Sequence, residues 1–277
     1  MKTITKLYHG TSEENARKIL REGITPRIDP DNCMKVLRPT QWERYPSRSD
    51  CVYLTEAYAP YFAAAAAPEG TGRWAILEID STKLDPLGFL PDEDALEQGS
   101  RELSESDLLG SGLAGSEHDA YNLVHTWDME VRTEFFKDNL PRYRHLATES
   151  LRLLGNIVYQ NIVPTSAITR VSFFDPRGNP HVALQCLDPQ ISTVNYQLCG
   201  AKYRDLTEWF FGGHYDWAEH SILPVTGREE NRRMYEALHP GRNLGDEFIA
   251  QMDALWAHPH SSLEIIDNST WKEEQSA

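Results

Sequence analysis

Leu7-Tyr8-His9-Gly10-Thr11-Ser12-Glu13-Glu14 is the stretch of sequence that decides the fold. Residues 4–8 alternate polar and apolar side chains, a pattern typical of a β-strand, and His9 follows at the end of that strand. Thr11 and Glu14 have the spacing of a capping box, which predicts that a helix begins directly after the strand. The apolar residues that continue at helical spacing are Ala16, Ile19 and Leu20.

A second informative stretch is Val52-Tyr53-Leu54-Thr55, which predicts a short buried strand. The alanine-rich residues 57–67 follow it and predict a helix, because Pro60 falls in the first turn, where proline is tolerated. Local patterns predict further strands over 73–80, 157–159, 168–174 and 182–187 and helices over 148–154 and 245–256.

The order of these stretches resembles ADP-ribosyltransferases of the His-Tyr-Glu class, the group of poly(ADP-ribose) polymerases and diphtheria-like toxins. The resemblance rests on Tyr8-His9-Gly10-Thr11, the helix after it and the later Val-Tyr-Leu-Thr, and it covers residues 4–80 well and 150–175 more weakly. It implies an α+β fold in which a split, mixed β-sheet with flanking helices grips NAD. We expect this domain over residues 1–187, followed by a C-terminal extension of unknown role over 188–277.

The resemblance also implies which residues bind NAD, which is a co-substrate in this family. His9 would hydrogen-bond a ribose hydroxyl of the adenosine half, and Gly10 would bind the nicotinamide amide through its backbone. Thr11 would place a hydroxyl beside the amide. Tyr53 would stack on the nicotinamide ring, and Tyr61 would supply a second aromatic wall.

The family's catalytic carboxylate has no direct counterpart in the sequence. The nicotinamide–ribose bond breaks through an oxocarbenium-like state, which a nearby carboxylate stabilises. In relatives, a glutamate begins a strand of the form Glu-apolar-apolar-Tyr, whereas this chain has Asn156-Ile157-Val158-Tyr159. Either Asn156 forms a weaker hydrogen bond in that place, or an acid comes from elsewhere. Glu149 before the strand and Glu97 in an acidic segment are the candidates.

Residues 85–145 form an acidic insertion within the predicted domain. Acidic side chains are frequent over 85–107, and residues 104–116 are rich in glycine and serine, so we expect either an inserted segment or a flexible loop, with a solvated surface over 92–107. Near the C-terminus, residues 175–180 predict a turn that joins strands 168–174 and 182–187 into a hairpin. The aromatic cluster Trp209-Phe210-Phe211 with Trp217 is expected to be core; if exposed, it would be a partner surface.

Residues 25–50 form the most basic region of an otherwise acidic chain, and they allow two functional interpretations. One of the arginines would pair with the NAD pyrophosphate. Alternatively, Trp42 and Tyr45 would stack on single-stranded nucleic acid while neighbouring arginines contact its phosphates. A solvated loop is the remaining possibility. The arginines next to these two aromatic residues are Arg38, Arg44 and Arg48.

Net charge, apolar runs and the spacing of cysteines and histidines limit which partners and which cellular compartment we expect. A formal net charge of −15 excludes a nonspecific DNA-coating protein, because such binding depends on Lys and Arg contacts to phosphates. No apolar run is long enough to span a membrane, and the N-terminus lacks a signal core, so we expect a cytoplasmic protein without membrane contact. The four cysteines and ten histidines have no metal-site spacing, so no metal is expected and the cysteines are predicted to be thiols.

These observations favour an NAD-dependent mono-ADP-ribosyltransferase that acts on a macromolecular acceptor, as a toxin in bacterial or phage conflict. Whether the acceptor is a protein or a nucleic acid stays open. A catalytically silent NAD or ADP-ribose binding protein is an alternative, because Asn156 stands where the acid is expected. RNA 2′-phosphotransferases share the fold and the His-Gly-Thr strand, but the strand of Tyr53 carries no second histidine. The last possibility is a structural protein in which the motif is coincidental.

Overall fold

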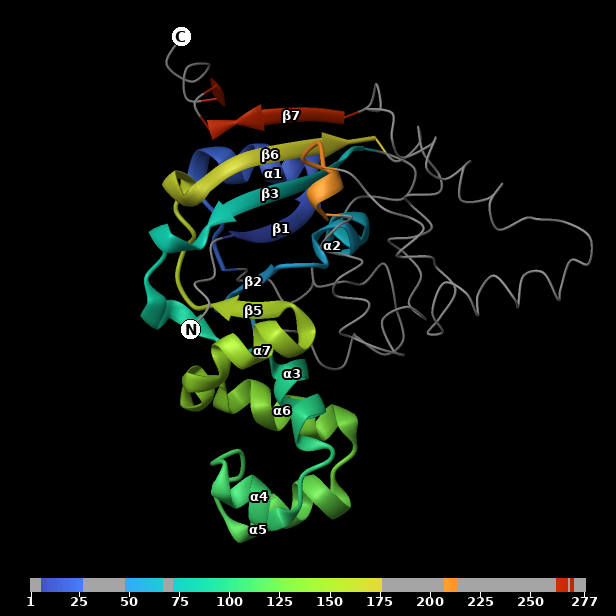
Figure 1. Ribbon diagram of the computed structural model, residues 1–277, viewed down its shortest axis with the longest axis vertical. Coiled ribbons are helices and arrows are strands. Elements are labelled where there is room, and N and C mark those ends of the chain that lie inside the picture. Colours follow the sequence, from blue (N-terminus) through green and yellow to red (C-terminus); the bar gives the residue numbers. More distant parts are fainter. Residues whose placement is uncertain are drawn as a thin grey trace, which may run out of the picture. The chain divides into compact units, whose positions relative to one another are not determined.

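The computed structural model describes residues 6–26, 48–66, 72–175, 207–213, 263–268 and 270–271. It has an α+β fold with one seven-stranded sheet in the order β4-β5-β2-β1-β3-β6-β7 (Figure 1). The α+β class is therefore confirmed. Every strand pair with a defined register is antiparallel, in contrast to the mixed sheet that we expected. The strands are β1 (Lys6–Ser12), β2 (Val52–Thr55), β3 (Trp74–Asp80), β4 (Phe89–Leu90), β5 (Asn156–Tyr159), β6 (Ile168–Phe174) and β7 (Leu263–Asp267).

The chain divides into two compact units. Unit 1 comprises residues 1–9, 17–56 and 79–168, and unit 2 comprises residues 10–16, 57–78 and 169–277. Strand β1 belongs to both, because unit 1 ends at His9 and unit 2 begins at Gly10. The α-helices are α1 (Glu13–Glu22), α2 (Ala59–Ala66), α3 (Glu93–Ser100), α4 (Glu105–Gly110), α5 (Glu117–Tyr121), α6 (Met129–Asn139) and α7 (Ala147–Leu154).

The junction of β1 and α1 differs by one residue from the predicted one. Ser12 caps the helix, because the backbone N–H of Asn15 donates to its Oγ at 3.4 Å. Thr11 instead belongs to β1 and is only 1% exposed. The prediction of Thr11 as the capping residue is therefore wrong, and its hydroxyl is available for another role.

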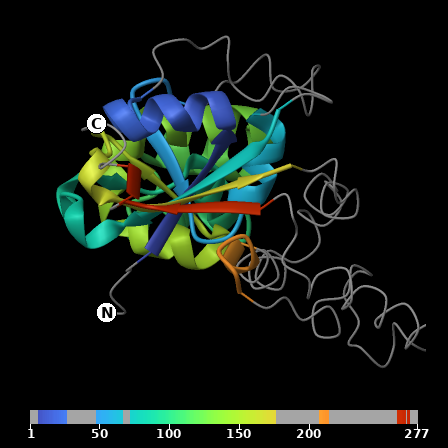
Figure 2. The same ribbon diagram turned by 90° about the horizontal axis from the view of Figure 1, so that it is seen from above.

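In unit 2, the C-terminal part of the chain supplies a strand that the sequence did not predict. Strand β7 pairs antiparallel with β6, from Arg170 opposite Asp267 to Phe174 opposite Leu263, and the two strands run side by side (Figure 2). The predicted return strand 182–187 lies outside the described residues, as does the helix over 245–256. The expectation for Trp209-Phe210-Phe211 is confirmed, because all three side chains are buried, whereas Trp217 lies outside the described residues.

In unit 1, the acidic insertion is a small helical bundle, so of the two alternatives the flexible loop is wrong. It contains α3 to α6 together with the irregular helical turns Asn122–Thr126 and Leu140–Leu146, and the predicted helix α7 follows it. Its short helices begin where a polar side chain caps the first turn, as at Ser104, Ser116 and Asp128. The glycine- and serine-rich sequence therefore marks helix starts and the turns between helices.

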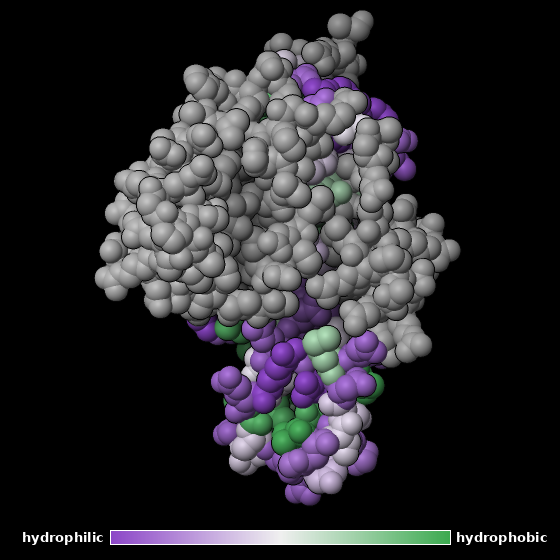
Figure 3. All heavy atoms as spheres, turned by 90° about the vertical axis from the view of Figure 1, so that its right-hand side faces the viewer, coloured by the Kyte–Doolittle hydropathy of each residue, from purple (hydrophilic) through white to green (hydrophobic). Residues whose placement is uncertain are grey.

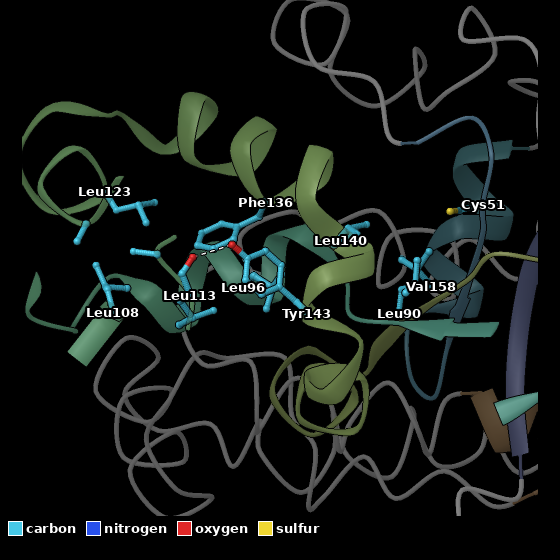
Figure 4. Close-up of a cluster of buried hydrophobic side chains, with 12 residues drawn as sticks. Cys51, Leu90, Leu96, Leu108, Leu113, Leu123, Phe136, Leu140, Tyr143 and Val158 are labelled. Atoms are coloured by element: carbon cyan, nitrogen blue, oxygen red, sulfur yellow. Dashed lines mark hydrogen bonds between the residues drawn. The ribbon is translucent and has the colours of Figure 1, made fainter. Parts of the chain in front are cut away.

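The insertion has a hydrophobic core of its own (Figure 4). Phe136 and Tyr143 are fully buried and meet edge to face, with ring centroids 5.6 Å apart. The Tyr143 hydroxyl donates to the carbonyl oxygen of Leu113 at 2.6 Å, which satisfies the one polar atom of that ring. The cluster continues through Leu90 and Val158, so the bundle packs directly on strands β4 and β5.

The surface of the insertion is mixed, with apolar side chains exposed among charged ones (Figure 3). The exposed large apolar residues of the bundle are Leu109, Tyr121, Val124, Met129 and Val131. The helices in the described ranges are too short or too polar to span a lipid bilayer.

Candidate functional site

His9 and Tyr53 lie side by side on neighbouring antiparallel strands of unit 1. Strands β1 and β2 pair with Tyr8 opposite Thr55, and His9 Nδ1 is 3.1 Å from the carbonyl oxygen of Tyr53. A carbonyl oxygen only accepts hydrogen bonds, so Nδ1 carries the proton and Nε2 of the neutral ring is an acceptor. The backbone of Tyr53 therefore fixes both the orientation and the tautomer of His9.

The side chain of Tyr53 contacts a carboxylate from the insertion. Its hydroxyl donates to Glu93, with distances of 2.7 Å to Oε1 and 2.9 Å to Oε2, and accepts from the backbone N–H of Arg48 at 3.1 Å. Burial and the nearby negative charge of Glu93 raise the pKa of Tyr53 well above its ordinary value. The phenol therefore stays protonated and remains a hydrogen-bond donor.

Glu93 is the first residue of α3, and the helix begins there because Asp92 caps it. Asp92 Oδ1 accepts from the backbone N–H of Asp94 at 2.9 Å, and the Asp92 N–H donates to Ser150 Oγ on α7 at 2.8 Å. Glu93 is 5% exposed, and this burial, reinforced by Asp94, raises its pKa to about 7 despite the hydrogen bond from Tyr53. It forms no ion pair with any residue that the structure describes.

Residues 27–47, most of the basic loop, lie outside the described residues, so its two interpretations stay predictions. Of the loop's arginines the structure describes Arg48, whose Nε donates to Asp50 at 2.7 Å and whose Nη1 donates to the Lys137 carbonyl oxygen at 3.0 Å. Arg48 thus anchors the end of the loop to α6. Beside it, Cys51 is a buried free thiol, and burial raises its pKa to about 12, which keeps it protonated and unreactive.

In unit 2, Gly10 is required by packing. A Cβ at this position would lie 1.9 Å from the Ala59 carbonyl oxygen and 2.6 Å from Ala63 N, so only glycine lets β1 approach α2. Thr11 comes next, and its buried Oγ1 has no hydrogen-bond partner among the described residues. Tyr61 lies on α2, partly buried, in edge contact with Phe62. Its role as a wall opposite Tyr53 stays a prediction.

The three predicted acid positions, Asn156, Glu149 and Glu97, have surroundings that differ from those of Glu93. Asn156 begins β5 opposite Thr55, and its Oδ1 is buried without a hydrogen-bond partner in the described part of the chain. Glu149 is half exposed, and both of its oxygens accept from Arg152, which lowers its pKa. Glu97 is 3% exposed and bridges two arginines, Arg101 and Arg132.

Sequence reasoning missed Glu93 because it treated the acidic residues 92–107 as a solvated surface. Asp92, Glu93 and Glu97 are in fact buried, so that expectation is wrong for them. A usable signal was present: Asp92 stands just before the apolar pair Ala95 and Leu96, as expected for a helix cap. Within the described ranges, no group of three His, Cys, Asp or Glu side chains could hold a metal ion.

No protein-family model matches the chain, and no curated protein matches it. Three chains of solved structures do. One of them, EcPltA, is 13% identical, with a TM-score of 0.31, and the match covers 63% of this chain and 78% of that chain. The likeness is a weak structural one.

Proposed function

We propose that the chain is an NAD-dependent mono-ADP-ribosyltransferase that acts on a macromolecular acceptor. The observation that supports this best is the pairing of His9 with Tyr53. These residues carry the resemblance in the sequence, lie far apart along the chain, and meet on neighbouring strands with a bond of 3.1 Å between them. A coincidental His-Gly-Thr motif would not require this arrangement.

Further polar atoms of the chain suit a hydroxyl- and amide-rich ligand such as NAD. The hydroxyl of Thr11 and the amide oxygen of Asn156 are buried without hydrogen-bond partners in the described residues. Leaving such atoms unpaired costs about 1–3 kcal/mol each, which a ligand would recover. Thr11 can both donate and accept, and Asn156 Oδ1 accepts from ribose hydroxyls or a carboxamide N–H.

In the proposed reaction, NAD supplies a positively charged nicotinamide as the leaving group. His9 holds a ribose hydroxyl through its Nε2 acceptor, because Nδ1 is already engaged by the backbone. Tyr53 presents its ring to the nicotinamide while Glu93 and the Arg48 backbone fix its hydroxyl. The apolar core of the insertion packs against Tyr53 and keeps water from that side of the ring.

A catalytically silent NAD-binding protein is the second candidate, and Asn156 is the observation that favours it. An amide at the position of the family's glutamate can hydrogen-bond the ligand, but it cannot stabilise positive charge on the ribose. NAD binding without nicotinamide release would support this function over the transferase.

The experiment is nicotinamide release from NAD by the purified chain, measured with and without a cell lysate as the source of acceptor. We expect release by the wild type and its loss in His9→Ala and Tyr53→Ala, while calorimetry reports weaker NAD binding in both variants. His118→Ala and Tyr121→Ala are matched controls, because both side chains are exposed on α5. Failure of the wild type to bind NAD at millimolar concentration would contradict both candidate functions.

A further inference from the structure

Resting on the proposed function, we propose that Glu93 is the catalytic carboxylate of this transferase, supplied by the helical insertion instead of strand β5. The helical insertion would then contribute a catalytic residue to the active site.

The first argument is the state of the other acids near β5. Glu149 is held by Arg152 at the surface, and Glu97 is neutralised by Arg101 and Arg132. An acid that is already paired with arginine has little capacity to stabilise a new positive charge. Asn156 carries no charge at all.

The second argument is the position of Glu93. Both of its carboxylate oxygens lie within 2.9 Å of the Tyr53 hydroxyl, at the tip of the ring that is proposed to stack on nicotinamide. The bond that breaks joins the nicotinamide to the ribose, so it lies next to the stacked ring. Helix α3 fixes the carboxylate there, because its cap at Asp92 is bonded to Ser150 on α7.

The third argument is that the charge of Glu93 is poorly compensated. Asp92 and Asp94 on its own helix are like charges, and Tyr53 on β2 offers a neutral donor. On α6, the positive charge of Lys137 lowers the pKa of Glu93, although Lys137 also forms an ion pair with Glu134. In the preceding loop the guanidinium of Arg48 is paired with Asp50. Burying a carboxylate without an ion pair opposes stability, and such groups concentrate at functional sites.

The same environment suits the chemistry. The bond between C1′ of the ribose and the nicotinamide nitrogen breaks, its electron pair leaves with the now neutral nicotinamide, and C1′ becomes positively charged. The ionised carboxylate stabilises that charge. The acceptor's nucleophilic atom then bonds to C1′ and loses a proton, which passes to Glu93 and from there to water. A carboxyl with a pKa of about 7 can both stabilise the positive charge when ionised and accept the acceptor's proton near neutral pH.

The test is Glu93→Gln, because glutamine still accepts a hydrogen bond from Tyr53 but carries no charge. We expect nicotinamide release to fall by about 100-fold or more, the usual effect of removing one electrostatic contact to a transition state. NAD affinity, measured by calorimetry, should stay near that of the wild type, and thermal stability at neutral pH should not fall. Glu102→Gln removes an exposed acid of the same insertion and should retain wild-type release.

Release by Glu93→Gln at the wild-type rate would overturn the assignment of Glu93 and leave the proposed function standing. No release by the wild type would overturn both. If Glu93→Gln does not fold, the pH dependence of nicotinamide release by the wild type tests the role of Glu93 instead. Wild-type release should rise with pH about a midpoint near 7, and Tyr53→Phe should move that midpoint upward, because the phenol's hydrogen bond stabilises the charged carboxylate. A flat wild-type profile through neutral pH would contradict the role of Glu93.

Discussion

Glu93 and Glu97 are two buried acids one turn apart on helix α3, and their surroundings differ. Glu97 is 3% exposed and bridges two arginines, of which Arg132 comes from α6. Glu93 is 5% exposed and has a phenol as its hydrogen-bond partner, with no ion pair among the described residues. The two acids are buried to nearly the same extent, so it is their partners that distinguish them.

Two neighbouring hydroxyl side chains at the start of α1 also differ in whether they have a hydrogen-bond partner. Ser12 uses its hydroxyl to cap the helix, whereas the Oγ1 of Thr11, one residue earlier, has no partner in the described part of the chain. In both pairs one side chain has a clear structural role, Glu97 with its arginines and Ser12 as the helix cap, and we propose that the other contacts the ligand. The predictions that follow test this contrast, beginning with the largest expected effect.

Glu97→Ala should lower the free energy of unfolding by about 3–5 kcal/mol, the usual cost of leaving a buried charge without its partner. The uncompensated charge would be Arg132, whose side chain is 18% exposed. Urea unfolding measures the change, with Glu102→Ala as the exposed control. An effect of Glu97→Ala as small as that of the control would show that the pair does not stabilise the bundle.

Glu93→Gln should have the opposite effect on stability. The pKa of Glu93 in the folded protein, about 7, lies above its ordinary value of 4.5, so the folded state binds the proton more tightly. The wild type should therefore lose up to about 3 kcal/mol of stability as pH rises from about 4.5 to about 7. The variant should lack this loss and be the more stable protein above pH 7. Parallel pH-dependent unfolding curves for the two proteins would contradict the prediction.

Tyr143→Phe should cost about 1–3 kcal/mol, because it leaves the buried carbonyl of Leu113 without its donor. The ring and its packing on Phe136 remain, so the change isolates the hydrogen bond. Thermal unfolding of the variant measures it. A result close to zero would mean that the carbonyl finds another partner or water.

Ser12→Ala should cost about 1 kcal/mol through loss of the helix cap. Thr11→Val, which keeps the shape of the side chain but removes the unpaired hydroxyl, should leave stability unchanged or raise it slightly. Thermal unfolding compares the two variants, and calorimetry with NAD shows whether Thr11→Val weakens binding. Equal destabilisation by both would mean that Thr11 shares the capping role.

Much of the fold could be predicted from local sequence. Strands β2, β3 and β6 and helix α7 were found because alternation and helical spacing are properties of a few neighbouring residues. Strand β7 was missed because its side chains are exposed or only partly buried, so it lacks the alternation of a strand with one buried face. The helices of the insertion were missed because they are short and their starting residues also occur in loops.

The candidate site could be predicted only in part, because local patterns show motifs but not which distant residues contact them. The sequence indicated His9 and Tyr53, and the structure brings them together. The helix cap at Asp92 could have indicated the start of α3, but not the burial of Glu93. A run of acidic residues normally faces water, and this burial depends on contacts with Tyr53 and with the core of the insertion. An acid that is supplied by an insertion leaves no spacing pattern relative to the motifs of the surrounding domain.

The pairing of β6 with β7 also has a consequence for biosynthesis. All residues between Phe174 and Leu263 must be translated before β6 receives its neighbour. At a translation rate of roughly 5–20 residues per second, the edge of β6 stays unpaired for several seconds while the rest of the chain is synthesised. Unpaired strand edges recruit other chains. The nascent protein therefore passes through a stage in which the edge of β6 is open to other chains, and binding of a chaperone at this stage would protect it.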